Sequence, residues 1–358
     1  MVVRIAARPL PTLLLAALCA IALVSCTTSD PVDDRLRGDA ELIDEIDATY
    51  ADDFERAAVA VVAGDDVRTA YVAADETTMF EVGSITMVLT GELFAIAIDR
   101  GEVTPDDRLG DHLDLADAPA ASVTLLQLAT HSSGLPMFPD DPDWVAEFDA
   151  RYAAHEDPVD EELDEMLALA RTATVTPDAG FAYSNFGAAL LGQALASAAG
   201  VEYPQLLRER VLDPIGMDDA VIVETPDQVP ETHAGGFSPS GDAVEPWSIG
   251  PYSPAGGVDA TLDDGVALAR AVLDGELEDS AALDPVAEVG PNSMIGYFWF
   301  IDEVHPRPRT ITGQGGQTGG FGTALLINRG AGTASIVLAN TESDPYRLGL
   351  RLLIAAER

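Results

Sequence analysis

Three short segments carry the side chains that could do chemistry, and the first of them is Phe80–Gly91. Within it, Gly83 and Ser84 precede an apolar run with helical spacing that stops at residues 100–101. This places Ser84 at the N-terminus of a buried helix, where backbone N–H groups and the helix dipole favour developing negative charge. Met87 lies one turn further on, on the same face. The segment therefore predicts either a serine nucleophile or a serine that merely caps a helix.

The second and third segments are Tyr183-Ser184-Asn185 and the glycine-rich stretch Gly313–Gly322. A tyrosine and an asparagine before a helix are by themselves a weak signal, because an aromatic core residue beside an N-cap would look the same. The glycine-rich stretch could cradle a phosphate. That interpretation is disfavoured because hairpin strands follow the stretch, where a phosphate site would need the N-terminus of a helix.

In combination, the three segments resemble the serine β-lactamase and penicillin-binding-protein family, which includes class C β-lactamases and D-Ala-D-Ala carboxypeptidases. The Phe-Glu-Val-Gly-Ser-Ile-Thr run around Ser84 is similar to the segment that holds the family's Ser-x-x-Lys motif. Tyr183 and Asn185 match the family's Tyr-x-Asn. Family members also carry Lys-Thr-Gly or His-x-Gly on a strand beside the site, and that frame puts Gln314 at the Lys/His position and Gly316 at the glycine.

The resemblance implies a role for each matched residue. Ser84 would be the nucleophile and Tyr183 the general base and acid, while substrate would bind at Asn185, Gln314 and Gly316. The backbone N–H of the serine, and another on the strand at residues 319–323, would form the oxyanion hole.

Neutral side chains occupy both positions at which the family carries cations. Met87 stands at the lysine of Ser-x-x-Lys and Gln314 at the second cation, and no lysine occurs anywhere in the chain to replace them. A thioether cannot relay a proton, and without a nearby cation the phenol of Tyr183 would keep a pKa of ~10. General acid–base assistance is typically worth ~10²–10⁴ in rate, so the sequence predicts a binding cleft with little or no turnover.

Two functions of different classes stay open at this point. The first is a weak serine hydrolase that acts on an ester or amide through Ser84. The second is an inactive family member that binds a cell-wall peptide or a protein partner. A purely structural surface lipoprotein is a third possibility, with no specific feature in its favour.

The five histidines are scattered along the chain without the spacing of metal ligands, so we predict no metal site and no cofactor. They are His112, His131, His155, His233 and His305. His131 stands beside two serines, which could suggest catalysis. The surrounding His131–Pro136 segment resembles a family turn, and its glycine and proline favour a structural turn instead.

The elements that must position these residues indicate an α/β (α+β) fold of the β-lactamase and transpeptidase type. We expect an antiparallel sheet built from about residues 55–75 and 290–358, flanked by helices, with a helical region over about residues 84–285. The predicted strands are Arg56–Ala63, Arg68–Ala73, Ile295–Ile301, Thr323–Asn328 and Thr333–Asn340. The predicted helices include Ala40–Ala51, Val123–Ala129, one that ends at Gly200, and Pro345–Glu357. Pro139–Thr176 should be a helical lid or side wall, and Pro254–Asp264 a turn that leads into a helix.

Residues 1–26 have the pattern of a bacterial lipoprotein signal. Arg4 and Arg8 precede an apolar stretch, which is followed by Leu-Val-Ser-Cys ending at Cys26. We expect cleavage before Cys26, lipidation of its thiol, a tether over residues 27–39, and a globular domain over 40–358 on the outer face of the cell membrane. The alternative is a single transmembrane anchor, for which the apolar stretch is short compared with the ~20 residues a span needs.

The composition limits the partners further. The chain of 358 residues has a formal net charge of −42, which disfavours nucleic acid and anionic membrane surfaces. We expect a monomer that is attached to the membrane only through its lipid. Its expected partner is a small molecule or peptide, such as a cell-wall peptide, a β-lactam or an ester.

Overall fold

The computed structural model describes residues 35–47, 54–305, 308–341 and 344–357. The chain divides into two units, Met1–Asp34 and Arg35–Arg358. The first unit lies outside the described residues. The signal, the lipidation of Cys26 and the greater part of the tether therefore stay predictions.

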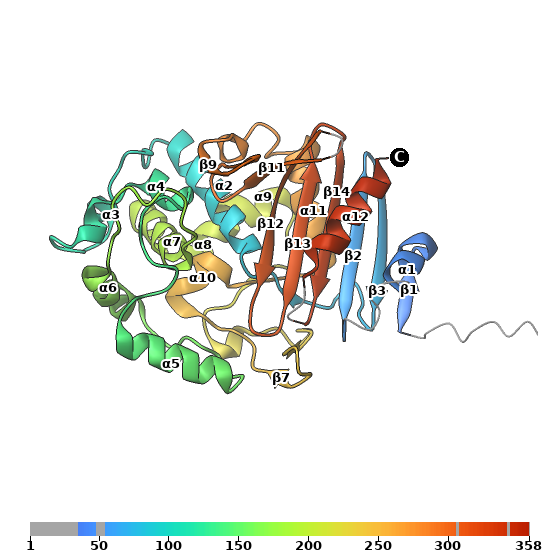
Figure 1. The fold of residues 1–358 in the computed structure, drawn as a ribbon, viewed down its shortest axis with the longest axis horizontal. Helices are drawn as coiled ribbons and strands as arrows, with labels where there is room; N and C mark the ends of the chain where they lie inside the picture. Colours follow the sequence, from blue (N-terminus) through green and yellow to red (C-terminus); the bar gives the residue numbers. More distant parts are fainter. Residues whose placement is uncertain (1–34, 48–53, 306–307, 342–343, 358) are drawn as a thin grey trace, which may run out of the picture. The chain divides into compact units, whose positions relative to one another are not determined.

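A nine-stranded antiparallel sheet is the main feature of the second unit (Figure 1). Its order is β1-β3-β2-β14-β13-β12-β11-β10-β9, so strands from the two ends of the sequence pair at its centre. The strands are β1 (Leu36–Gly38), β2 (Ala57–Ala63), β3 (Asp66–Val72), β9 (Ala287–Gly290), β10 (Ser293–Ile295), β11 (Phe300–Val304), β12 (Arg309–Gln317), β13 (Gly322–Asn328) and β14 (Thr333–Ala339).

Both faces of the sheet are covered, and β2 shows how the sequence achieves this. Side chains alternate along a strand, and β2 is apolar at every position from Ala57 to Ala63. Its odd-numbered residues pack with α1 (Ala40–Asp47) and α12 (Tyr346–Ala356). Its even-numbered residues belong to the larger core, which also includes residues of α2 (Ile85–Asp99) and α11 (Leu262–Asp274).

The segment between β3 and β9 is mainly helical. Besides α2 and α11 it contains α3 (Leu109–His112), α4 (Leu125–Ala129), α5 (Pro142–Ala153), α6 (Leu163–Thr172), α7 (Asn185–Ala199), α8 (Tyr203–Leu207), α9 (Asp213–Ile215) and α10 (Ser253–Gly256). Short 3₁₀ or π turns lie at η1 (Pro119–Ser122), η2 (Arg208–Leu212), η3 (Pro226–Gln228), η4 (Gly250–Tyr252) and η5 (Ala281–Leu283). Two small antiparallel sheets complete the segment, formed by β4 (Phe80–Glu81), β8 (Val258–Ala260) and β5 (Val221–Ile222), and by β6 (Gly236–Phe237) and β7 (Ala243–Val244).

The predicted fold class is confirmed, and three local predictions need correction. The end of the predicted tether over residues 27–39 is a strand, because Leu36–Gly38 pairs with β3. The stretch Ile295–Ile301 is not extended throughout: Gly296 N–H donates to the Trp299 carbonyl over 2.9 Å, which closes a turn between β10 and β11. A short strand, β8, interrupts the predicted turn at Pro254–Asp264.

Within the described ranges, no helix has both the length and the apolar character that crossing a bilayer would require.

Candidate active site

Ser84 stands at the junction of β4 and α2, at the N-cap of the helix. Gly83 before it has a φ of +54°, and a Cβ there would lie 2.7 Å from the backbone nitrogen of Gln317. Only glycine combines this backbone with so close an approach to β12. The side chain of Ser84 makes no capping hydrogen bond to the first turn of α2. Its hydroxyl is therefore not used as a helix cap, which was the alternative interpretation of this serine.

Close packing of β12 against Val82 explains why a glycine occupies position 316. A Cβ at this position would lie 2.0 Å from the Val82 carbonyl oxygen, and the Thr323 hydroxyl donates to the same oxygen over 2.9 Å. These contacts fix β12 against the segment that ends in Ser84. The strand amide that these contacts bring beside Gly83 is that of Gln317, at the end of β12. The second oxyanion-hole amide expected at residues 319–323 stays a prediction.

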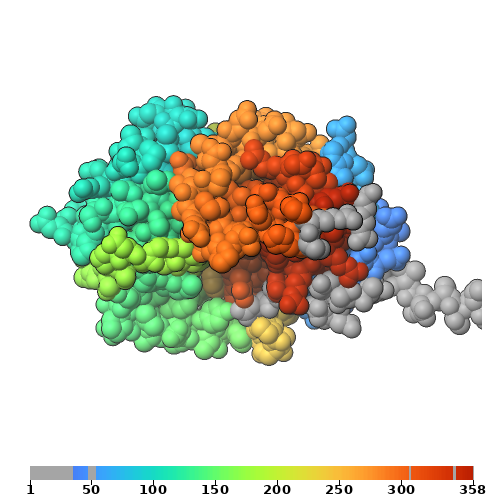
Figure 2. Space-filling view, turned by 45° about the horizontal axis from the view of Figure 1, so that its top comes forward, coloured from blue at the N-terminus to red at the C-terminus, as the bar shows by residue number. Residues whose placement is uncertain are grey.

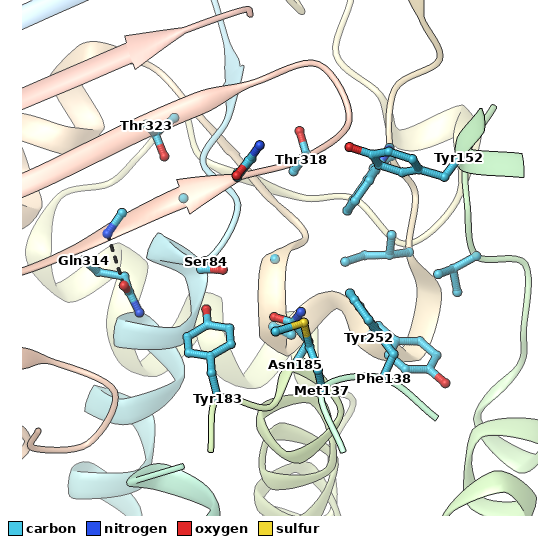
Figure 3. A pocket seen from close by; sticks show the side chains of 18 of the residues that line it. Ser84, Met137, Phe138, Tyr152, Tyr183, Asn185, Tyr252, Gln314, Thr318 and Thr323 are labelled. Atoms are coloured by element: carbon cyan, nitrogen blue, oxygen red, sulfur yellow. Dashed lines mark hydrogen bonds between the residues drawn. The ribbon is translucent and has the colours of Figure 1, made fainter. Parts of the chain in front are cut away.

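The predicted site residues lie around one cavity of about 820 Å³ (Figure 3). Those that line it are Ser84, Tyr183, Asn185, Gln314 and Gly316. They come from α2, from the segment at the start of α7, and from β12, so elements far apart in the sequence supply them.

The contact between Tyr183 and Met87 affects the proton chemistry available in this cavity. The phenol of Tyr183 donates a hydrogen bond to the Met87 sulfur over 3.3 Å, and Met87 is completely buried. Burial raises the pKa of Tyr183 to about 12, although hydrogen bonding with Ser84 opposes the shift. The serine and tyrosine are thus paired. At neutral pH, however, the tyrosine is a phenol whose proton points to a thioether, and not a phenolate that could accept a proton.

Gln314 is buried in the wall of the cavity, and its amide is held by the backbone. Its side-chain oxygen accepts from Gly315 N–H over 3.1 Å, and its side-chain nitrogen lies 3.5 Å from the Phe298 carbonyl oxygen. Figure 3 shows the amide oriented in this way. A group held like this provides neither a charge nor a freely turning donor to a ligand.

His131 supports Tyr183 from behind and remains uncharged. It is fully buried, its ring centroid lies 4.3 Å from that of Tyr183, and its Nδ1 accepts from Ser184 N–H over 3.2 Å. Burial lowers the pKa of His131 to about 3, so it is neutral at physiological pH. These contacts agree with the predicted structural turn at this residue.

The sequence interpretation missed the aromatic wall of the cavity. This wall consists of Phe138, Phe148, Tyr152, Trp247 and Tyr252. Part of the signal was present, because Trp144, Phe148 and Tyr152 recur every four residues and therefore share one face of α5. Their rings stack in sequence, with centroids 5.1 and 6.1 Å apart. Helix α5 lies at the surface (Figure 2), and its residues Phe148 and Tyr152 line the cavity. The predicted side wall at residues 139–176 is therefore aromatic where it meets the cavity.

Comparison with known proteins gives a clear family assignment. A family model described as Beta-lactamase matches residues 41–357. The chain belongs to the β-lactamase family.

Several relatives and solved structures are similar to this β-lactamase-family chain. It is 32% identical over 163 residues to the D-alanyl-D-alanine-carboxypeptidase/endopeptidase AmpH of Escherichia coli, a match that covers 42% of this chain and 38% of AmpH. It is 27% identical over 214 residues to penicillin-binding protein 4 of Amycolatopsis lactamdurans, covering 57% of this chain and 53% of that protein. The matched stretches thus span about half or less of these relatives.

The solved structures agree in fold. A class C β-lactamase superposes with a TM-score of 0.75 at 18% identity, covering 88% of this chain and 96% of its own. The class C β-lactamase of Rhodobacter sphaeroides superposes with a TM-score of 0.72 at 20% identity, covering 88% and 98%.

A buried ionisable cluster lies next to the site of this β-lactamase-family chain. His233 Nε2 lies 3.3 Å from Glu81 Oε1 and 3.8 Å from Asp259 Oδ2, and all three side chains are buried. Burial would lower the pKa of His233, but its hydrogen bond to Glu81 and the charges of Asp259 and Glu81 raise it. Burial and the Glu81 charge raise the pKa of Asp259. Glu81 also accepts from Trp247 N–H over 3.0 Å, which ties the cluster to a residue of the aromatic wall.

No group of three or more His, Cys, Asp or Glu side chains within the described part of the chain has the arrangement of a metal site.

Proposed function

We propose that this β-lactamase-family protein is an exported lipoprotein that binds a small-molecule or peptide ligand beside Ser84 and transfers its acyl group slowly, if at all. The single observation that carries the proposal is the hydrogen bond from the Tyr183 phenol to the Met87 sulfur, 3.3 Å long. It places a proton where acyl transfer would need a proton acceptor.

The transfer of the Ser84 proton to a base determines the expected rate of acyl transfer. For Ser84 to attack an acyl carbon, its proton must move to a base, and Tyr183 is the phenol paired with it. A pKa of about 12 lies five units above neutral pH, so the phenol outnumbers the phenolate by roughly 10⁵ at pH 7. The N-terminus of α2 and the amide of Gln317 beside Gly83 can still stabilise negative charge on a carbonyl oxygen. An acyl group can therefore bind in a suitable position without efficient attack.

The ligand class and the location follow from the relatives and from the sequence. One relative is named a D-alanyl-D-alanine-carboxypeptidase/endopeptidase and another a penicillin-binding protein, which supports a cell-wall peptide, a β-lactam or a related ester as ligand. The lipoprotein signal ending at Cys26 supports attachment by its lipid to the outer face of the bacterial membrane, where we propose that the protein is a monomer.

Intact-mass analysis of the purified protein tests the proposal. The protein is incubated at pH 7 with a neutral fluorophosphonate and separately with a penicillin, with Ser84→Ala as the control. We expect slow and incomplete labelling by the fluorophosphonate, absent in Ser84→Ala. Rapid stoichiometric labelling at Ser84, or fast hydrolysis of either reagent, would show that the serine is fully activated and would contradict the proposal.

A further inference from the structure

The cavity beside Ser84 combines aromatic walls with an unusual set of charges. Across it from Ser84 and Tyr183 lie the rings of Phe138, Tyr152 and Tyr252 (Figure 3). Tyr152 meets Trp247 edge to face, with centroids 6.4 Å apart, and their rings continue the wall. Aromatic faces present negative electrostatic potential to whatever binds against them.

The charged groups at the cavity have the same sign as these faces. Its lining includes two carboxylates, Asp149 and Asp344, and none of the described lining residues is a lysine, arginine or histidine. Arg347 comes within 4.0 Å of Asp344, but both side chains are more than two-thirds exposed, so water screens this pair. Asp149 follows Phe148 directly on α5, at the aromatic wall.

The arginine of α5 does not supply the missing charge. Arg151 lies 3.7 Å from Asp160, outside the cavity lining. The region over residues 139–176 therefore contributes aromatic rings and a carboxylate to the site, and no cation among its described side chains.

A ligand carboxylate would find no charged partner in this cavity. Gln314 holds its amide against the backbone, and Met87 offers only a buried thioether. Removing a carboxylate from water without a cation or several donors is strongly unfavourable. An ammonium group meets the opposite situation, because aromatic faces attract it and the exposed carboxylates add a smaller attraction that water screens. The net charge of −42 also concentrates cations around the whole molecule.

We infer that the cavity selects an organic cation, namely an ester or amide whose acyl group lies at Ser84 and whose ammonium group lies against the wall of α5 and Trp247. This inference rests on the proposed function, since it concerns the ligand of the same site. It makes molecules that are recognised through a free carboxylate unfavourable ligands of this cavity.

Three probes of similar size but different charge test the inference. They are benzyltrimethylammonium, its neutral isostere neopentylbenzene, and phenylacetate. Binding to the full-length protein is followed through the indole N–H signal of Trp247 in NMR spectra, which Trp247→Phe identifies. We expect benzyltrimethylammonium to bind about tenfold more tightly than its isostere, phenylacetate to bind weakest, and salt to weaken the cation alone.

Three variants locate the effect. Asp149→Asn should weaken binding of the cation about threefold. Glu147→Gln, with the same charge change on an exposed part of the same helix but outside the cavity lining, should leave it unchanged. Gln314→Lys should reverse the order of benzyltrimethylammonium and phenylacetate.

Equal affinity for the cation and its isostere, tighter binding of phenylacetate to the native protein, or no binding of any probe would overturn the inference. Because probe binding requires no reaction, these outcomes do not depend on how fast Ser84 reacts. Fast labelling of Ser84 with the cation preference intact would contradict only the proposed slow transfer.

Discussion

The cavity around Ser84 and the buried cluster beside it differ in the ionisable groups they hold. At the cavity, the positions that would move a proton are a thioether, an amide and a phenol that burial keeps protonated. In the cluster, Glu81, His233 and Asp259 are ionisable and buried together, and Glu81 is close to Ser84 in the sequence. Glu92, in the middle of α2, is a further buried carboxyl.

The difference shows that the buried ionisable groups hold elements of the fold together outside the cavity. The buried carboxyls and His233 connect elements: Glu81 joins β4 to the Trp247 segment, and Glu92 accepts from Trp299 Nε1–H over 2.8 Å. Ionisable groups outside the cavity therefore connect elements of the fold around it. The cavity holds no matching group for proton transfer, so the proposed function implies that positioning and activation of Ser84 are separable.

The largest effect should come from restoring a base to the cavity. In Met87→Lys, an amine would replace the sulfur that now accepts the hydrogen bond from Tyr183, and a buried lysine has a lowered pKa that suits proton acceptance at neutral pH. We expect the rate of fluorophosphonate labelling at Ser84 to increase ~10²–10⁴-fold. Met87→Leu, similar in size and without a base, should label as the native protein does. A folded Met87→Lys protein, judged by circular dichroism, with an unchanged rate would refute the separation of positioning from activation.

The cluster should respond in stability and not in reactivity. His233→Ala would leave Glu81 and Asp259 as two buried carboxyls without their shared partner. Breaking a buried charge pair in this way typically costs ~3–5 kcal/mol of the free energy of unfolding. Urea denaturation measures the loss, with the exposed His305→Ala as a control that should change little. If the two variants were equally stable, the cluster would not support the site.

Glu92 should make the protein less stable as the pH rises. Burial raises its pKa from an ordinary 4.5 to about 7, although hydrogen bonds from Ser280 and Trp299 oppose the shift. Between these values the folded protein binds a proton that the unfolded chain has released, so stability is full below pH 4.5 and decreases up to about pH 7. Over this pH range, Glu92 should lower the free energy of unfolding by about 3 kcal/mol.

Urea denaturation at pH 5, 6 and 7 checks this, since Glu92→Gln should show a shallower decrease than the native protein. Exposed Glu288→Gln is the matched control and should keep the native slope. Parallel pH profiles for the native protein and Glu92→Gln would mean that this carboxyl titrates normally in the folded state.

Local patterns predicted the elements that position Ser84. The apolar spacing after Ser84 gave helix α2, and the four residues Arg329–Gly332 between two apolar runs gave the β13–β14 hairpin. The segment match also placed Tyr183 and Gln314 in one cavity with the serine. These features depend on residues close together in the sequence or on a motif with fixed spacing.

The remaining features depend on contacts between distant segments, which no local pattern reports. His233 meets Glu81 across 152 residues, and β8 is defined only by its pairing with β4 and β5. The turn at Gly296–Trp299 breaks a stretch whose aromatic residues alone indicated a strand. The Tyr183–Met87 hydrogen bond likewise joins residues 96 apart, so the sequence predicted a missing base but not where the phenol proton would go.

Titration of Tyr183 tests the central claim most directly, because the claim is that Ser84 is positioned beside a phenol that stays protonated. The protein is labelled with ¹³C at the tyrosine Cζ atoms, and its NMR spectrum is recorded from pH 6 to 12, with Tyr183→Phe identifying the resonance. We predict no change in that resonance up to about pH 10 and only about half of its full shift at pH 12. A midpoint at or below about pH 8 would provide Ser84 with a base near neutral pH and would contradict the account.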